Sequence, residues 1–250
     1  MHTAPTQPSQ AEREAHEATH LPYRSWCRHC VRGKGKSESH KRLDAEKEHT
    51  IPTVSMDYCF MGQVDDDKTL PILGIRDHRH KVTFSHLVPS KGTKHPYSVG
   101  QVVHDIDQLG HSNSLKNDQE PAILDLQKQV VVELKEKGIE CIPENSPVSE
   151  SQSNGVIERG IQDIEGQVRV LKDMLDHKYK RKIESTHPIL PWLINHAGVL
   201  ITRFQVGVDG RTAYERLKGK PFRKALVPIG ECIHYQPLGR AKAAPTAWKN

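Results

Sequence analysis

Apolar and polar residues alternate along the chain from position 53 to position 60. Every second position carries a large apolar side chain, and a single carboxylate, Asp57, lies in the middle of the segment. This two-residue period is typical of a strand with one buried face. Two further strands are predicted at 70–75 and 81–88. The short connections between the three strands favour an antiparallel meander.

The spacing of apolar residues then changes to that of helices. Helices are predicted over 96–110 and 121–138, because each segment begins with proline, which suits a first turn, and ends at glycine. A short strand at 114–117 lies between them, so Asp118 falls just past a strand end. A fifth strand is predicted at 139–142.

The clearest period in the chain predicts a long helix. Its apolar positions are separated alternately by four and three residues. They are Ile157, Ile161, Ile164, Val168, Leu171 and Leu175. Glu158 lies one position off this seam, so its carboxylate is expected beside the core at the solvent edge. A last helix at 189–204 completes an α/β domain with a mixed sheet.

Composition narrows the class of protein. The 250 residues are 35% hydrophobic and contain no apolar run near the ~18 residues of a membrane span, so no membrane role is expected. The polar N-terminus resembles neither a secretory signal nor a transit peptide, which favours an intracellular protein of the nucleus and cytoplasm. Five cysteines, an odd number, favour reduced thiols. The net charge is +5, and the charged residues are unevenly distributed along the chain, which favours a polyanionic partner.

Residues 1–50 differ from the rest, because they contain few aliphatic residues and cannot bury a core without metal or a partner. Two histidines and a Cys-x2-Cys pair in this segment form a ligand set that suits tetrahedral Zn²⁺. The four residues are His16, His20, Cys27 and Cys30. His29 or His40 is an alternative for one histidine, and chance proximity among 16 histidines is the competing explanation.

Three acidic residues stand in distinctive surroundings: Asp57 in VSMDYCFMG, Asp118 in SLKNDQEPAILDL and Glu158 in SPVSESQSNGVIERGIQ. Hard cations such as Mg²⁺ or Mn²⁺ take carboxylate ligands, and two such ions can clamp the attacking and leaving oxygens of a phosphodiester. Two strand-borne aspartates and one helix-borne glutamate would suit that task. Position alone is weak evidence, because the chain has 31 acidic residues.

The sequence around these acids resembles the retroviral-type integrase core, in particular its copia-like retrotransposon branch. The resemblance is carried by NDQEPAI, SPVSESQSNGVIERGIQ and the downstream DGRTAYERLKGKPF, in this order. It covers about 51–204 and implies a ribonuclease-H-like fold, with Asp57, Asp118 and Glu158 as the catalytic triad that binds Mg²⁺ or Mn²⁺. Two features depart from the family pattern. The interval between the last two acids is longer than usual, and Asn117 stands where many members have Thr.

The resemblance also implies a division of the chain. Residues 1–50 would be a His/Cys segment similar to the zinc domain of the family, although the gap from His20 to Cys27 is far shorter than usual. Residues 51–205 would be the catalytic core, and 206–250 a basic C-terminal tail.

The implied activity is DNA integration, which consists of metal-dependent trimming of a 3′ end and transfer of that end into target DNA. The implied partners are double-stranded DNA, from the element ends and the target, and further copies of the chain in a homo-oligomer. Asn154, Gly155, Arg159 and Gln162 are expected to touch DNA. The alternatives are a catalytically inactive nucleic-acid-binding remnant and a nuclease of the same fold that cuts without joining.

Other charged groups have simpler interpretations. A run of three acids is predicted to be a solvated turn; it comprises Asp65, Asp66 and Asp67. Three more acids are predicted on helix surfaces, and they are Asp105, Asp107 and Asp125. Basic stretches at 24–42 and 177–182 are candidates for contact with phosphates.

Overall fold

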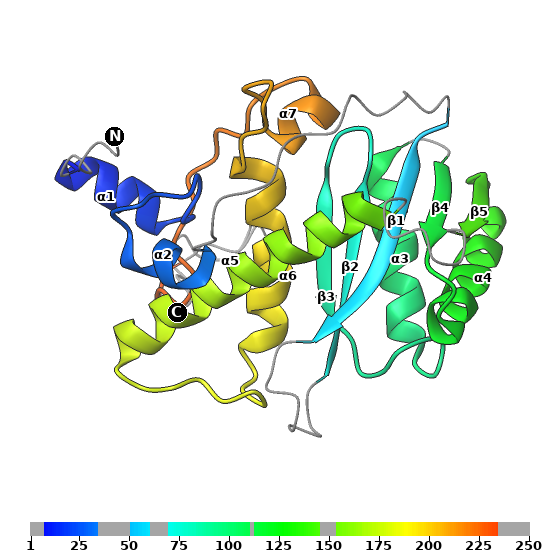
Figure 1. Ribbon diagram of the computed structural model, residues 1–250, viewed down its shortest axis with the longest axis horizontal. Coiled ribbons are helices and arrows are strands. Elements are labelled where there is room, and N and C mark those ends of the chain that lie inside the picture. The colour runs from blue at the N-terminus through cyan, green and yellow to red at the C-terminus, as the bar shows by residue number, and fades with distance from the viewer. Residues whose placement is uncertain (1–7, 35–50, 61–69, 111–112, 146–153, 235–250) are drawn as a thin grey trace, which may run out of the picture.

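In the part of the chain that the structure describes, five strands form one mixed sheet in the order β3-β2-β1-β4-β5 (Figure 1). β1 (Thr53–Phe60) is central, antiparallel to β2 (Pro71–Asp77) and parallel to β4 (Asn113–Asn117). β3 (Thr83–Leu87) and β5 (Cys141–Asn145) form the edges. This strand order, with helices on both faces, is the ribonuclease-H-like arrangement, so the predicted fold class is confirmed. The computed structural model describes residues 8–34, 51–60, 70–110, 113–145 and 154–234.

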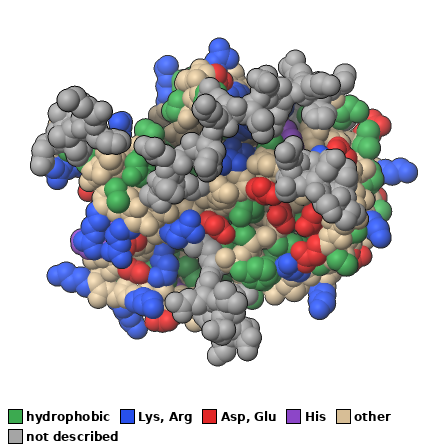
Figure 2. All heavy atoms as spheres, viewed as in Figure 1, with side chains coloured by type: hydrophobic (Ala, Val, Ile, Leu, Met, Phe, Trp, Pro, Cys, Tyr) green, Lys and Arg blue, Asp and Glu red, His purple; other side chains and the backbone are tan. Residues whose placement is uncertain are grey.

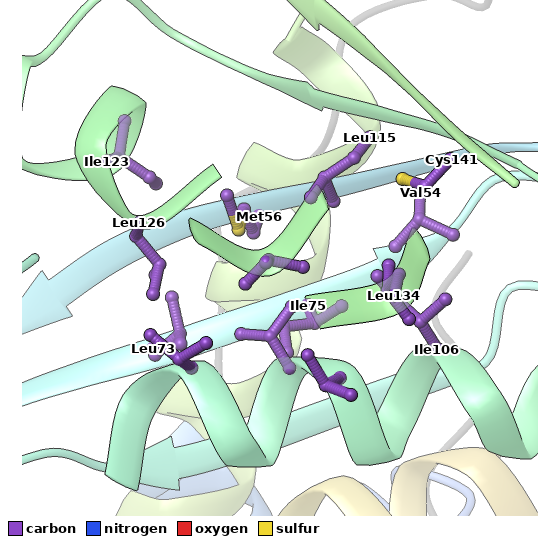
Figure 3. Close-up of a cluster of buried hydrophobic side chains, with 14 of the residues drawn as sticks. Val54, Met56, Leu73, Ile75, Ile106, Leu115, Ile123, Leu126, Leu134 and Cys141 are labelled. Atoms are coloured by element: carbon purple, nitrogen blue, oxygen red, sulfur yellow. The ribbon is translucent and has the colours of Figure 1, made fainter. Parts of the chain in front are cut away.

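One face of the sheet is covered by α3 (Pro96–Leu109) and α4 (Pro121–Glu136). The apolar residues of β1 point to this side and pack with side chains of both helices (Figure 3). The labelled members of this cluster are Val54, Met56, Leu73, Ile75, Ile106, Leu115, Ile123, Leu126, Leu134 and Cys141. The predicted strand at 53–60 and the two helices are therefore confirmed. The polar positions of β1 face the opposite side of the sheet.

The opposite face is covered by α5 (Gly155–Tyr179) and α6 (Leu190–Phe204), which pack on each other and on the sheet. The predicted apolar seam of α5 is buried or packed against the core along its length, so the long helix is confirmed. Gly198 lets α6 approach β3 closely, since a Cβ atom there would lie 2.7 Å from Ser85 Oγ.

Turn residues set most boundaries of these elements. Gly110 and Gly138 follow α3 and α4 with φ values of 73° and 76°, which glycine adopts without steric cost. β5 continues to Asn145, beyond the predicted end at 142. Pro143 is tolerated within it because β5 is an edge strand that pairs only with β4.

Three helices were not predicted from the apolar pattern. α1 (Gln10–Glu17) and α2 (Arg28–Lys34) stand outside the sheet, and α2 packs across α5 (Figure 1). α7 (Ala213–Lys218) lies in the predicted tail and begins with a capping box between Thr212 and Glu215. Across the described ranges, no helix has the length and apolar character that crossing a membrane requires.

Candidate functional site

The register of the parallel pair β1 and β4 brings two of the predicted acids together. Ser55 pairs with Lys116, so the same register continued by two residues sets Asp57 beside Asp118. Asp57 lies in mid-strand, and Asp118 follows directly after β4, as predicted. Both continue the polar alternation of their strands, so both belong to the face of the sheet that α5 covers.

α5 carries the third acid to the same region. Glu158 lies in the first turn of α5 and is exposed. Three residues later, Ile161 packs over Gly74, where a Cβ atom would lie 2.5 Å from Ile161 Cδ1. Gly74 is the register partner of Asp57 on β2. The absence of a side chain at Gly74 therefore allows the beginning of α5 to cross the sheet next to Asp57.

Burial and like charges act together on Asp57. The pKa of Asp57 is raised to about 6, mainly by burial and further by the carboxylates of Asp118 and Glu120. The Tyr58 backbone N–H and the Lys91 ammonium act in the opposite direction and lower this pKa. A divalent cation would offset the repulsion between these carboxylates, and carboxylate oxygens are the ligand type that Mg²⁺ and Mn²⁺ prefer.

The three acids are less tightly gathered than a set of metal ligands. Within the described part of the chain, Asp57, Asp118 and Glu158 do not form a group whose donor atoms all lie within 4.8 Å of one another. Asp118 Oδ1 accepts a hydrogen bond from the Glu120 N–H at 3.0 Å, and Asp57 Oδ1 accepts one from the Tyr58 N–H at 2.7 Å. Glu158 is exposed, so its side chain can change rotamer without disturbing the core.

Lys91, in the loop after β3, is a charged neighbour that the sequence did not reveal. Its ammonium binds both carboxylate oxygens of Glu120, at 2.7 and 2.9 Å. It also lies 5.3 and 5.2 Å from the ring centroids of Tyr58 and Phe60. Tyr58 Oη accepts a hydrogen bond from the Gly92 N–H at 2.9 Å, which fixes the loop against β1. These contacts join residues about 30 positions apart, and no local motif signals them.

The four residues expected to touch DNA lie at the beginning of α5. Asn154 precedes the helix and Gly155 is its first residue. Arg159 has a side chain that is 61% exposed and pairs with Asp163 at 3.3 Å. Gln162 is exposed one turn further along. The structure therefore brings all four close to Glu158 in sequence and in space, and it leaves the Arg159 guanidinium accessible.

The predicted zinc ligands converge in the N-terminal segment. All four are buried, and their ligand atoms lie within 4.8 Å of one another. His16 Nε2 lies 3.3 Å from Cys30 Sγ, and His20 Nδ1 lies 3.4 Å from Cys27 Sγ. A tetrahedral ion with Zn–N near 2.0 Å and Zn–S near 2.3 Å separates such atoms by about 3.5 Å. The donor set therefore fits Zn²⁺.

The two thiols of this set differ in acidity. The pKa of Cys27 is lowered far below that of a free thiol, because Cys27 is hydrogen-bonded to Cys30 and to the rings of His16 and His20. The pKa of Cys30 is raised by the same contact with Cys27 and by burial. The thiolate is the form that binds metal, and both sulfur atoms belong to the ligand set.

The His/Cys segment is attached to α5 through α2. A Cβ atom at Gly33 would lie 2.9 Å from the Val170 backbone nitrogen, so the two helices touch at their backbones. Arg169 Nε donates to the Gly33 carbonyl at 3.2 Å, and the Gln167 amide donates to the Thr19 carbonyl at 2.7 Å. The same helix thus carries Glu158 at one end and the His/Cys segment further along.

The alternative zinc ligands are placed differently. His29 pairs with Asp173 of α5, which also binds Arg32 at 3.1 Å. His29 therefore serves the attachment of the segment to α5 and not the cysteine pair. His40 lies outside the described residues.

The structure contradicts the prediction for Asp105, one of the acidic residues outside the predicted triad. It was predicted to lie on the helix surface, but it is only 2% exposed and pairs with His86 of β3 at 2.6 Å. The prediction was wrong because this partner on the sheet satisfies the buried carboxylate. Asp107 and Asp125 are exposed, as predicted. The run of acids at 65–67 lies outside the described residues.

Surface charge is divided between two regions of one face (Figure 2). Lys and Arg side chains gather over α2 and the C-terminal half of α5, whereas acidic side chains gather over the sheet beside the first half of α5. The basic stretch at 177–182 is exposed at the end of α5, and the stretch at 24–42 is described as far as Lys34.

No protein-family model matches the chain, and no curated protein matches its sequence. Among solved structures, the chain is similar to the catalytic core domain of BIV integrase, with 17% identity, coverage of 67% of this chain and 93% of that one, and a TM-score of 0.44. It is also similar to the HTLV-2 integrase catalytic core domain in complex with magnesium, with 14% identity, coverage of 68% and 99%, and a TM-score of 0.48. A simian T-cell lymphotropic virus intasome gives 12% identity, coverage of 79% and 68%, and a TM-score of 0.45. Each likeness is one of fold.

Proposed function

We propose that the chain is the integrase of a copia-like retrotransposon and joins the ends of the element's DNA to target DNA. The observation that carries this proposal is the strand register that sets Asp57 beside Asp118, next to the beginning of α5 and Glu158. In this proposal 51–205 is the catalytic core, 1–50 the His/Cys segment and 206–250 the basic tail. Because two DNA ends must be joined together, we expect the chain to act as a homo-oligomer on nuclear DNA.

The proposed reaction is a pair of in-line displacements at phosphorus. Bound Mg²⁺ or Mn²⁺ would supply the charge that activates the attacking oxygen and stabilises the leaving one. Asp57 and Asp118 would bind the metal from the sheet, and Glu158 would complete the ligand set from α5. The chain supplies position and charge, so no covalent intermediate on the protein is required.

We assign a structural role to Zn²⁺ at the His/Cys set. Four protein ligands fill a tetrahedral site and leave no position for substrate. The ion would instead hold α1 and α2 in the conformation that packs on α5.

Two related functions remain as competitors. A catalytically inactive remnant would bind nucleic acid through the basic surface of α2 and α5 (Figure 2), and the separation of the three carboxylates favours it. A nuclease of this fold would share the metal ligands and differ only in its product.

Strand transfer of a short duplex end into plasmid DNA, with Mg²⁺ or Mn²⁺, tests the proposal. We expect joined product from the natural chain and none from Asp118→Asn or Glu158→Gln. Asp125→Asn is the matched control, since Asp125 is exposed on α4, and it should join normally. Cleavage without joining would support the nuclease. A folded chain that binds DNA and yields no product in either metal would contradict catalysis and support the remnant.

A further inference from the structure

A cleft of about 270 Å³ opens between the His/Cys segment and α5. Tyr23 and Lys34 line it from the N-terminal segment, and Arg159, Gln162 and Arg169 line it from α5. Its volume is near the lower end of the range of about 300–1,000 Å³ that small-molecule sites occupy. The cleft is therefore small, and a single nucleotide is a ligand of suitable size.

The lining of this cleft attracts anions. Lys34, Arg159 and Arg169 contribute cations, and Asp163 is the one carboxylate in the described lining. Asp163 is bound by Arg76 at 3.1 Å and by Arg159 at 3.3 Å, and Arg169 pairs with Glu165 at 3.6 Å, so cations still outnumber carboxylates around the cleft. Burial lowers the pKa of Lys34 to about 8, which leaves its ammonium charged at neutral pH. The remaining positive charge favours a phosphate group.

Tyr23 adds an aromatic wall to this basic cleft. Its side chain is 46% exposed, and Leu21 lines the cleft beside it. Gly166 lets Lys34 lie along α5, since a Cβ atom there would be 3.1 Å from Lys34 Cγ. Proteins that bind single strands combine such cations for the backbone with an aromatic ring for a base.

We propose that this cleft holds one unpaired nucleotide of a DNA strand. The phosphate would lie on Arg159, Arg169 and Lys34, and the base would stack on Tyr23. This inference rests on the proposed integrase function and adds to it a contact for the strand that leaves the acidic site along α5. Glu158 and Arg159 are neighbours in the first turns of that helix, so such a strand would pass directly from one site to the other.

Binding of a fluorescent oligothymidine to the zinc-loaded full chain, without Mg²⁺ or Mn²⁺, tests the inference. We expect Tyr23→Ala and Arg159→Met each to weaken binding about tenfold. Tyr97→Ala is the matched control, because Tyr97 is 41% exposed on α3, on the other face of the sheet. Lys135→Met, an exposed cation on α4, controls for charge. Both controls should bind like the natural chain.

Competition separates a strand from a free anion. Displacement by unlabelled oligothymidine, but not by inorganic phosphate at the same concentration, supports the inference. Equal displacement by inorganic phosphate would overturn it, and so would equal losses in the Tyr23→Ala and Tyr97→Ala variants. Strand transfer is measured separately. If the natural chain joins DNA and Tyr23→Ala binds oligothymidine as tightly as the natural chain, the cleft proposal is contradicted and the integrase proposal stands. If Tyr23→Ala loses oligothymidine binding but the natural chain joins no DNA, catalysis is contradicted and the cleft proposal stands.

Discussion

The carboxylate of Asp57 is held at a position where its charge is unfavourable. Its pKa is raised from 3.8 to about 6 by burial and by neighbouring carboxylates. The folded chain therefore binds more protons than the unfolded chain between these values, so this residue makes stability fall as pH rises from about 4 to about 6. Above about pH 6 the ionised Asp57 carboxylate destabilises the fold to its full extent. Such a destabilising carboxylate beside other acids is expected where a cation binds.

We therefore expect Asp57→Asn to raise the free energy of unfolding at pH 7 in buffer that contains no Mg²⁺ or Mn²⁺. The gain should shrink as pH is lowered through about 6 and vanish below about 4, because the natural side chain is then protonated in both states. Urea unfolding of the two proteins across this pH range measures the difference. Asp125→Asn, on the exposed side of α4, should show no such trend. A loss of stability in Asp57→Asn at pH 7 would contradict this account.

The crossing of α2 and α5 determines how the His/Cys segment meets the core. In Gly33→Ala the new methyl group would lie 2.9 Å from the Val170 backbone nitrogen, which cannot move without shifting α5. We expect a loss of about 1–3 kcal/mol in thermal or urea unfolding, as for other overpacked contacts. Gly100→Ala is the matched control, since a Cβ atom at Gly100 of α3 meets nothing within 4 Å. That change should stabilise by about 0.5–1 kcal/mol, and equal effects of the two changes would argue against a tight crossing.

The elements with their own apolar period could be predicted from sequence, and those that depend on contacts could not. β1 and α5 were predicted because burial of one face imposes the period. α1 and α2 were missed because their order comes from the buried His/Cys set and from α5, and α7 was missed although Thr212 and Glu215 form a recognisable capping box. In the site, Asp57 and Asp118 could be identified from the sequence motifs around them. Lys91 could not, because its ion pair with Glu120 joins segments that are distant in the sequence.

Across the whole molecule, we expect one zinc ion per chain to secure the N-terminal segment against α5. Cys27→Ser removes one of the two sulfur ligands and should abolish zinc retention, because a tetrahedral site loses most of its affinity without that ligand. Elemental analysis after gel filtration measures the bound zinc, and proteolysis within 8–34 should become faster as the metal is lost. Cys232→Ser, at an exposed cysteine, is the control and should keep its zinc. Equal zinc content in both variants would rule out the His/Cys set as the ligand.

Binding of Mn²⁺ to the folded chain tests the central claim, which is that β1, β4 and α5 assemble one divalent-cation site. Calorimetric titration above pH 7, where the Asp57 carboxylate with its pKa of about 6 is ionised, should show binding by the natural chain. Asp118→Asn and Glu158→Gln should weaken this binding by more than about tenfold, and Asp125→Asn should leave it unchanged. If Asp118→Asn binds Mn²⁺ as tightly as the natural chain, the three acids do not form the site.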